Sequence, residues 1–315
     1  MPELPEVEVV RAGLQPAVTN ALVTGVEIFD ERSLRRHVPA AGSFAEQLTG
    51  RRVLAAVRRG KFLWLPLDSD RALVIHLGMS GQVLLRTPGA ALDRMLRIRL
   101  TLEHPTHGEL WVNFVDQRIF GSMAVDAMGP TRDGLPGGYS GQLHADAAWQ
   151  DRIPSQVAHI ARDPIDPSFA SSSFFAALAR KNTGIKRALL DQNLISGIGN
   201  IYADEALFAA RMHYEQPAAS LSPAKARTLL AAVRTILHRA LAEGGTSFDA
   251  QYVNVNGQSG YFAHSLEAYG RQGRPCSRCG TLIVREQFMN RGSHFCPRCQ
   301  RLRLPITQRR AARAS

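Results

Sequence analysis

The sequence predicts an α+β protein with more than one domain, and three observations carry this prediction. Short apolar runs separated by turns fill the chain from residue 22 to about residue 126, helical periodicity follows beyond residue 167, and all four cysteines lie in one block near the end. With 315 residues, 45% of them hydrophobic, the chain is long enough for two cores and a small satellite domain. This composition excludes a disordered or collagen-like chain.

A short amphipathic helix is predicted directly after Pro5. Val7, Val10 and Leu14 share one stripe of it, and Glu6 stands in its first turn, where a carboxylate favours the helix dipole. The first ten residues carry three glutamates, unlike a signal peptide, and the chain has no apolar run of about 18 residues. We therefore expect a soluble, cytoplasmic protein.

The next hundred residues predict strands, followed by a linker. The apolar runs expected to form strands are 52–57, 62–67, 73–77, 95–102 and 110–114. Residues 128–150 are rich in glycine, serine and polar residues and look like an insertion. The segment Asp163-Pro164-Ile165-Asp166-Pro167 is too stiff for a helix interior, so we place the interdomain linker at residues 146–167.

The second half predicts helices. Ile185 and Leu189 share one helix face, and a glycine-rich turn then leads to a second helix with Asn200 as its expected N-cap. Glycines and free amides at such a helix start favour phosphate binding, although ordinary helix capping explains the same turn. A long helix is expected between Ser222-Pro223 and Gly244-Gly245. Residues 246–273 are either a long loop or a hairpin.

The cysteines predict a structural zinc site. Two Cys-x2-Cys pairs stand 16 residues apart, which suits four thiolates around one zinc ion, and the four predicted ligands are Cys276, Cys279, Cys296 and Cys299. Two disulfides or four unrelated thiols are the alternatives. Between the pairs, residues 281–285 alternate like a strand and His294-Phe295 leads back, so we expect a zinc-held β-hairpin with Arg291 at its tip.

The charge indicates a polyanionic partner. The net charge is +11, and basic side chains gain affinity for phosphates by releasing counterions. An anionic membrane surface is the rival interpretation, but no long basic amphipathic helix supports it. We therefore expect a nucleic acid as partner, no membrane and a monomer. The last residues, 301–315, contain arginines and no acid and predict a disordered, phosphate-seeking tail.

Five motifs in order resemble bacterial formamidopyrimidine-DNA glycosylase. They are Met1-Pro2-Glu3-Leu4-Pro5-Glu6-Val7-Glu8, His76-Leu77-Gly78-Met79-Ser80-Gly81, Asp116-Gln117-Arg118-Ile119-Phe120-Gly121, Gly197-Ile198-Gly199-Asn200-Ile201-Tyr202 and the terminal cysteines. The resemblance implies an N-terminal β-sandwich with a flanking helix, a helix-two-turn-helix domain and a zinc finger. The expected bounds are 1–145 for the catalytic domain, 168–274 for the helical domain with a lesion-capping loop inside 246–269, and 275–300 for the finger.

The same resemblance implies a bifunctional enzyme of base excision repair. It removes oxidised purines (8-oxoguanine and formamidopyrimidines) from double-stranded DNA, and it cleaves the strand at abasic sites by β,δ-elimination. If Met1 is removed, Pro2 becomes a terminal amine that forms the Schiff base. At pH 7 about 14% of a typical chain-terminal amine is unprotonated, against only about 0.04% of a typical lysine side chain, so the terminal amine is the more available nucleophile.

Three further residues complete the expected catalytic set. Glu3 matches the family's general acid and base, Lys61 matches a proton donor or phosphate anchor, and Glu6 supports them. Without the resemblance, the two glutamates are explained by helix-start electrostatics and Lys61 by an exposed surface position.

The DNA contacts also follow from the resemblance. Met79, Arg118 and Phe120 match the side chains that fill the gap left by an everted base, with Arg118 facing the orphaned cytosine. Burial in a strand core is the alternative for Met79 and Phe120. The residues expected to hold phosphates beside the lesion are Lys186, Asn200 and Arg291.

Two departures and two rival functions remain open. Gln117 and Ile119 stand where the family often has proline and a second basic residue, and Leu4 stands where the sister enzyme endonuclease VIII typically has glycine. Endonuclease VIII uses the same proline chemistry but prefers oxidised pyrimidines, so Leu4 favours the purine enzyme. A zinc-containing DNA-binding protein without activity is the other alternative, against which the intact Pro2, Glu3 and Lys61 argue.

Overall fold

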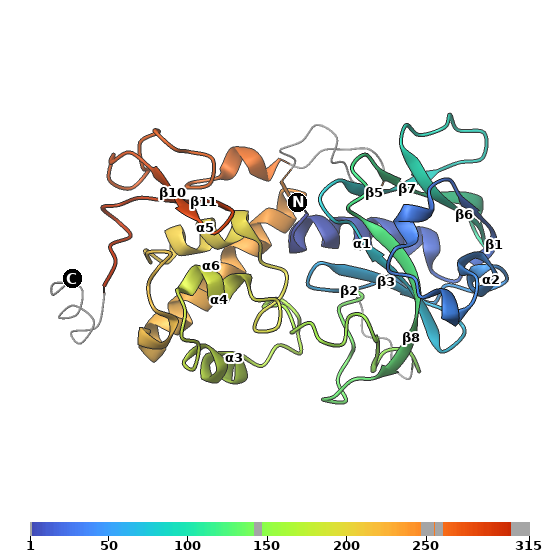
Figure 1. Cartoon of the computed structure of the whole chain (residues 1–315), viewed down its shortest axis with the longest axis horizontal. Coiled ribbons are helices and arrows are strands. Elements are labelled where there is room, and N and C mark those ends of the chain that lie inside the picture. The colour runs from blue at the N-terminus through green and yellow to red at the C-terminus, as the bar shows by residue number, and fades with distance from the viewer. Residues whose placement is uncertain (1, 142–146, 247–254, 256–260, 304–315) are drawn as a thin grey trace.

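The computed structural model describes residues 2–141, 147–246, 255 and 261–303. Two bodies lie side by side, a β-sandwich from the first half of the chain and a helical domain that carries the C-terminal hairpin (Figure 1). Helix α1 (Leu4–Val18) lies where they meet, and it contacts both the sandwich strands and the long helix α6. The chain from Pro2 onward therefore begins between the two domains.

The sandwich consists of two antiparallel sheets. The four-stranded sheet has the order β1 (Leu22–Ile28), β6 (Leu96–His104), β7 (Gly108–Asp116), β5 (Gly81–Arg86). The five-stranded sheet has the order β2 (Val57–Arg59), β3 (Phe62–Pro66), β4 (Arg71–His76), β8 (Ser122–Pro130), β9 (Arg152–Pro154). Val10 of α1 shares one buried core with Leu63 and Ile75 of one sheet and Phe114 of the other. The predicted sandwich with a flanking helix is confirmed.

Short helices complete this domain, and one strand prediction for it is wrong. The short elements are η1 (Glu31–Leu34), η2 (Pro39–Ala41) and α2 (Phe44–Leu48). Residues 52–57 were expected to form one strand, but only Val57 belongs to β2. Arg52 and Val53 make single bridges to two different partners, Leu22 and Leu67, so no continuous ladder forms there.

The described parts of the region predicted as insertion and linker, 128–141 and 147–167, pack on the outer face of the five-stranded sheet. Strand β9 lies inside the predicted linker 146–167 and pairs with β8, and Ile153 packs with Trp64 in a second buried cluster. Gly138 crosses this face so closely that a Cβ atom would lie 2.5 Å from the Trp64 ring. The linker prediction is therefore wrong for residues 152–154, which are part of the sandwich, because their apolar side chains cover an otherwise exposed sheet face.

The helical domain contains α3 (Ser171–Leu178), α4 (Ile185–Leu190), α5 (Asn200–Ala209), η3 (Ala218–Ser220), α6 (Pro223–Ala242) and η4 (Phe262–Ser265). The long helix begins as predicted, since Ser222 Oγ accepts the Lys225 amide at 3.4 Å, and Gly244 and Gly245 follow its end with φ of 75° and 82°. The N-cap prediction for α5 is wrong by one residue, because Gly199 is the cap and Asn200 is the first helical residue.

The C-terminal hairpin pairs β10 (Val284–Phe288) with β11 (Arg291–Phe295). Its first strand begins later than the predicted residue 281, because residues 281–283 turn back onto the cysteine loop. The Cys276 amide donates to the Thr281 carbonyl at 2.9 Å and the Ile283 amide to the Arg274 carbonyl at 2.9 Å. Residues 281–283 are therefore extended, as the alternating pattern predicts, but they pair with residues 274–276 and not with the other strand of the hairpin.

The predictions for the lesion-capping loop, in 246–269, and for the basic tail, 301–315, fall mostly on residues outside the described part of the chain.

Among the helices that the structure describes, none combines the length and apolar character needed to span a bilayer.

Candidate active site

The start of the chain is inserted into the helical domain. Leu4 is completely buried in the helical core, and its amide donates to the Gly197 carbonyl at 2.9 Å. Gly197 has φ of +88°, and a Cβ atom there would lie 2.6 Å from Leu4 Cδ1, so the turn before α5 requires glycine. These contacts fix the residues on either side of Leu4 at the domain junction.

Glu3 lies at the N-terminus of α5. Its carboxylate accepts the amides of Gly199, Ile201 (2.9 Å) and Tyr202 (3.4 Å), and thus satisfies donors that a helix start leaves free. Burial raises the pKa of Glu3 from 4.5 to about 7, against the opposing effects of Lys61 and of the amide hydrogen bonds. A carboxyl group with this pKa can both donate and accept a proton near neutral pH.

Glu6 has a positioning role in this arrangement. Its carboxylate accepts the Glu3 amide at 2.8 Å, the Tyr202 hydroxyl at 2.6 Å, and the amide and hydroxyl of Thr246 at 2.7 and 2.8 Å. Tyr202 belongs to α5 and Thr246 follows α6, so Glu6 joins α1 to α5 and to the segment after α6. The helix-start interpretation is therefore correct for Glu6 but incomplete.

Lys61 is brought to the same place from the sandwich. Its ammonium donates to the Ile198 carbonyl at 2.9 Å, in the turn before α5. Burial lowers the pKa of this amine below its usual range, opposed by the nearby Glu3 and Glu6 carboxylates. The alternative of an exposed surface lysine is wrong.

A buried ion network fixes the backbone just before Lys61. One oxygen of Asp163 accepts from the Arg58 guanidinium at 2.8 Å and from the Gly60 amide at 3.2 Å. Arg58 also pairs with Glu8 of α1 at 2.9 Å, so the network joins α1, β2 and the interdomain segment. Sequence reasoning missed Asp163 and Arg58, because nothing local indicates that they meet.

Pro2 and Lys61 line one cavity of about 190 Å³ at the domain junction. His76, at the end of β4, lines it as well and was not assigned a role from sequence, although it opens one of the family motifs. Burial and the charges of Arg36 and Arg35 lower the pKa of His76 to about 4. Its Nδ1 accepts the Gly78 amide at 3.2 Å, so the neutral ring presents Nε2–H as a donor.

Met79, Arg118 and Phe120 lie on two adjacent loops at one edge of the sandwich. Met79 is 42% and Phe120 39% exposed, so the alternative of burial in a strand core is wrong for both. The Arg118 guanidinium lies 4.7 Å from the Phe120 ring centroid. The three side chains predicted to act together are thus gathered at one site and left accessible.

The expectation that Lys186 binds a phosphate directly is contradicted. Its side chain is fully buried, its ammonium pairs with Asp204 at 2.6 Å, and it donates to the Gly292 carbonyl at 3.2 Å. A buried ammonium needs its counterion, and moving the Lys186 ammonium from Asp204 to DNA would break this ion pair and leave Asp204 with only its bonds to Ser293 and His294. In this structure, Lys186 fastens the zinc hairpin to α4 and α5.

Asn200 and Arg291 lie at the same junction. The Asn200 side-chain amide donates to the Gly292 carbonyl at 3.1 Å, while its buried Oδ1 has no hydrogen-bond partner within the described structure. Arg291 follows a two-residue turn and is exposed, so its guanidinium is available to an anion. The neighbouring Gly292 carbonyl accepts from Asn200, at the start of the helix whose amides Glu3 accepts, so the hairpin turn lies close to Glu3.

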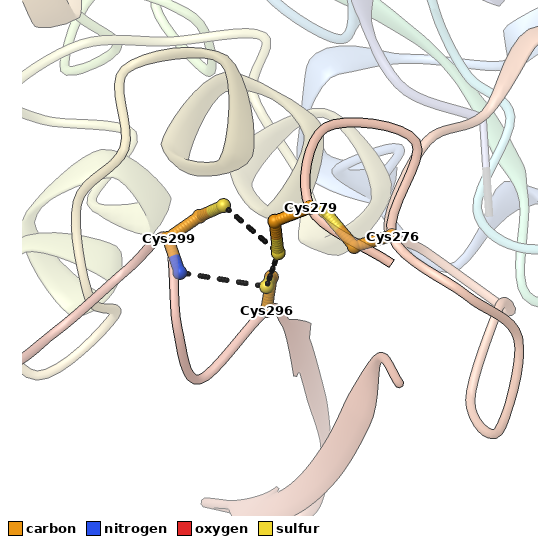
Figure 2. A group of neighbouring side chains, drawn as sticks. All are labelled: Cys276, Cys279, Cys296 and Cys299. Carbon is orange, nitrogen blue, oxygen red and sulfur yellow. Dashed lines mark hydrogen bonds between the residues drawn. The ribbon is translucent and has the colours of Figure 1, made fainter. Parts of the chain in front are cut away.

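The four cysteines converge at the base of the hairpin (Figure 2). Their sulfur atoms all lie within 4.8 Å of one another, and Cys279 Sγ is 3.5 Å from the sulfurs of both Cys296 and Cys299. Disulfide bonds would require about 2 Å, whereas tetrahedral zinc–thiolate bonds of about 2.3 Å fit this spacing. The predicted four-thiolate zinc site is confirmed, and the disulfide alternative is wrong.

Three sequence profiles match the chain in the order of its domains. They are the formamidopyrimidine-DNA glycosylase N-terminal domain over residues 1–123, the formamidopyrimidine-DNA glycosylase H2TH domain over 160–251, and a zinc finger found in FPG and IleRS over 273–302. With the fold and the thiolate cluster, they define the class of protein as a DNA repair glycosylase with a zinc finger domain. The chain belongs to the formamidopyrimidine-DNA glycosylase family, and the predicted resemblance is confirmed.

Individual relatives agree over nearly the whole chain. The chain is 68% identical to the formamidopyrimidine-DNA glycosylase of Leifsonia xyli subsp. xyli over 304 residues, which are 96% of this chain and 100% of that protein. Identity to the enzyme of Thermobifida fusca is 54%, over 95% and 97% of the two chains.

Solved structures give the same result. The MutM (Fpg) protein of Thermus thermophilus superposes with a TM-score of 0.74 at 34% identity, covering 96% of this chain and 100% of that one. The Lactococcus lactis Fpg bound to DNA with an abasic site superposes with a TM-score of 0.75 at 27% identity, covering 95% and 99%.

Proposed function

We propose that this protein is a bifunctional DNA glycosylase and abasic-site lyase that removes oxidised purines, such as 8-oxoguanine and formamidopyrimidines, from double-stranded DNA. The observation that carries the proposal is the convergence of Pro2, Glu3 and Lys61 at the domain junction, beside a cavity that Pro2 and Lys61 line. Relatives that are named for this activity, and a relative solved with abasic DNA, support it. The cytoplasmic location remains a prediction.

The chemistry begins at Pro2 once Met1 has been removed. The ring nitrogen attacks C1′ of the damaged nucleotide, an N–C bond forms, and the glycosidic bond to the base breaks. The nitrogen then loses its proton to water, and breaking of the C1′–O bond with protonation of the ring oxygen opens the sugar and yields an iminium ion. Because proline is a secondary amine, this iminium carries a positive charge without needing a further proton, and it acidifies the hydrogen atoms at C2′. Transfer of one C2′ proton to water breaks the C3′–O bond and expels the 3′ phosphate, and transfer of the C4′ proton to water in a second elimination breaks the C5′–O bond and expels the 5′ phosphate.

Glu3 supplies the proton that opens the sugar. With a pKa of about 7, its carboxyl holds a proton in a large fraction of molecules at neutral pH and can deliver it to the ring oxygen. Lys61 stays close to Glu3 and, as an ammonium, can protonate the leaving base or hold the adjacent phosphate. Neutral His76 can donate from Nε2 to the same phosphate.

The accessible loops and the hairpin supply the DNA contacts. Met79 and Phe120 are apolar and exposed, as side chains that enter the base stack must be, and Arg118 can donate two hydrogen bonds to an orphaned cytosine. Arg291 would bind the DNA backbone, and Asn200 would hold the hairpin turn next to Arg291 through its bond to the Gly292 carbonyl. Lys186 contributes to this grip indirectly, by fixing the hairpin.

Cleavage of a set of defined duplexes tests this function. We expect rapid cutting of 8-oxoguanine:C and formamidopyrimidine:C duplexes, slower cutting of thymine glycol duplexes, and no cutting of undamaged DNA. Preferential cutting of thymine glycol would instead favour an enzyme like endonuclease VIII. Leu4 does not decide this question by itself, since it packs against Gly197 in the helical core and does not line the cavity of Pro2 and Lys61.

Loss of the zinc site is expected to weaken DNA binding while leaving the sandwich folded. Cys296→Ser removes one thiolate, frees the hairpin and so withdraws Arg291, which should reduce affinity for lesion-containing and undamaged duplexes alike by at least about tenfold. Fluorescence anisotropy measures the affinity and mass spectrometry the bound zinc. Ser277→Ala, an exposed change in the same cysteine loop, is the control. Full affinity in a zinc-free Cys296→Ser protein would contradict the role assigned to the hairpin.

A further inference from the structure

The loop Asp116–Gly121, which carries Arg118 and Phe120, has an unfavourable backbone conformation. Ile119 has φ of 54°, in the left-handed region that β-branched residues rarely adopt. A conformation of this kind persists only where the surroundings impose it. The contacts that hold this loop are therefore expected to matter for whatever its side chains do.

Asp116 holds the loop from the amide side. Its carboxylate is buried and accepts the Arg118 amide at 3.1 Å, the Gly121 amide at 2.6 Å and the Ser80 hydroxyl at 2.6 Å. These bonds hold two backbone amides of the loop, those of Arg118 and Gly121, but none of its carbonyl groups.

Arg35 holds the loop from the carbonyl side. It directly follows η1, and its guanidinium donates to the carbonyls of Ile119 at 2.9 Å, Gly121 at 2.6 Å, and Phe120. One planar guanidinium with several donors can satisfy three consecutive carbonyls, which a lysine ammonium cannot do in the same geometry. Arg35 thus closes a clamp whose other half is Asp116.

The clamp also controls the loop that carries Met79. Gly78 has φ of +62°, and a Cβ atom there would lie 2.3 Å from the carbonyl carbon and oxygen of Phe120. Since Arg35 fixes that carbonyl and Ser80 bonds to Asp116, both loops share one set of supports. The positions of all three exposed side chains therefore depend on Arg35.

We propose that Arg35 is a positioning residue that holds Arg118 and Phe120 in the geometry needed to enter the base stack, and that it thereby sets the preference for cytosine opposite the lesion. This inference rests on the proposed function, because it assigns a support to the contacts proposed there. It adds a residue that lies outside the five motifs that carry the family resemblance.

The test compares Arg35→Gln and Arg35→Lys with Arg52→Gln. Arg52 is a matched control, since it is an exposed arginine whose guanidinium donates to one backbone carbonyl, that of Asn20 at 2.6 Å, in another part of the sandwich. Two readouts are used at a temperature at which all variants are folded. One is the ratio of single-turnover cutting rates on 8-oxoguanine:C and 8-oxoguanine:A duplexes. The other is the fluorescence of 2-aminopurine beside an uncleavable abasic analogue, which reports unstacking.

We expect the C:A ratio of Arg35→Gln to fall about fivefold or more, as for the loss of a bidentate base contact, together with a smaller rise in fluorescence. Arg35→Lys should lie between this variant and the wild type, and Arg52→Gln should match the wild type. An unchanged ratio and fluorescence in Arg35→Gln would overturn the proposal. So would an equal slowing of cutting on both duplexes at constant ratio and unchanged fluorescence, because Arg35 would then act as a simple phosphate contact.

Failure of the proposed function gives a different result. If the wild-type protein cuts neither lesion duplex, the function itself is wrong. If it cuts 8-oxoguanine:C preferentially and Arg35→Gln retains that preference, the function stands and only the clamp fails.

Discussion

A form of the protein that keeps any residue before Pro2 is expected to lose both base excision and strand cleavage. An extra residue turns the Pro2 nitrogen into an amide, whose lone pair is delocalised and cannot attack C1′. Because this nitrogen is proposed to act in every covalent step, we expect the loss to exceed about a hundredfold, as for removal of an enzymatic nucleophile. A form with a single extra residue should still bind DNA that contains an uncleavable abasic analogue, because the extension blocks the chemistry of the nitrogen and not the DNA contacts.

A removable N-terminal tag gives the sharpest form of this experiment. The protein is purified with a tag that a protease cuts directly before Pro2, and the same preparation is assayed before and after the cut. Activity should appear only after cleavage, whereas the same tag placed after Ser315 should have no effect. If the tagged protein cleaves abasic DNA at the normal rate, another nucleophile acts, and Lys61, which lines the same cavity and has a lowered pKa, is the first candidate.

Glu3→Gln is expected to separate the two activities. The amide cannot deliver a proton to the sugar ring, so base excision should fall by about a hundredfold to ten-thousandfold, the usual contribution of general acid–base catalysis. A pre-formed abasic site already offers an aldehyde to Pro2, so its cleavage should fall much less. Single-turnover rates on 8-oxoguanine:C and abasic:C duplexes measure both steps.

Glu6→Gln is the comparison for this experiment. Glu6 accepts bonds from Tyr202 and Thr246 and holds the Glu3 backbone, so its loss should lower thermal stability and reduce both activities together. If Glu3→Gln also reduced both activities equally, Glu3 would be a structural cap of α5, and its proposed role in proton transfer would be wrong.

The raised pKa of Glu3 also predicts a dependence of stability on pH. The unfolded carboxyl loses its proton near pH 4.5, while the folded one keeps it to about pH 7. Between these values the native state binds the additional proton, so the contribution of Glu3 to stability falls as the pH rises from about 5 to 7. The difference in melting temperature between the wild type and Glu3→Gln should shift against the wild type over this range.

Elements with a strong local signal were predictable from sequence. The helix α6 follows from Ser222, Pro223 and the two glycines at its end, and the zinc site follows from cysteine spacing alone. In both cases the determining groups lie close together along the chain, so their chemistry is visible before folding. The proposed catalytic residues were predicted only through the family motifs, since Glu3 and Lys61 have ordinary local explanations.

Contacts between distant segments account for what was missed. Lys186 was expected at a phosphate, but Asp204 and the Gly292 carbonyl surround its ammonium, and neither can be inferred from its neighbours. Gly199 replaces Asn200 as the cap of α5 because the Glu3 carboxylate, 198 residues before Ile201, satisfies the helix amides. Arg35 likewise becomes informative only when it is seen against a loop 84 residues away.

Trapping of the covalent intermediate tests the central claim most directly. Borohydride added during reaction with an 8-oxoguanine:C duplex reduces the iminium to a stable amine, and mass spectrometry of the digested complex locates the modified residue. We predict a single adduct, on the nitrogen of Pro2 at a chain end that lacks Met1. An adduct on Lys61 or another side chain, or efficient base excision with no trapped complex, would contradict it.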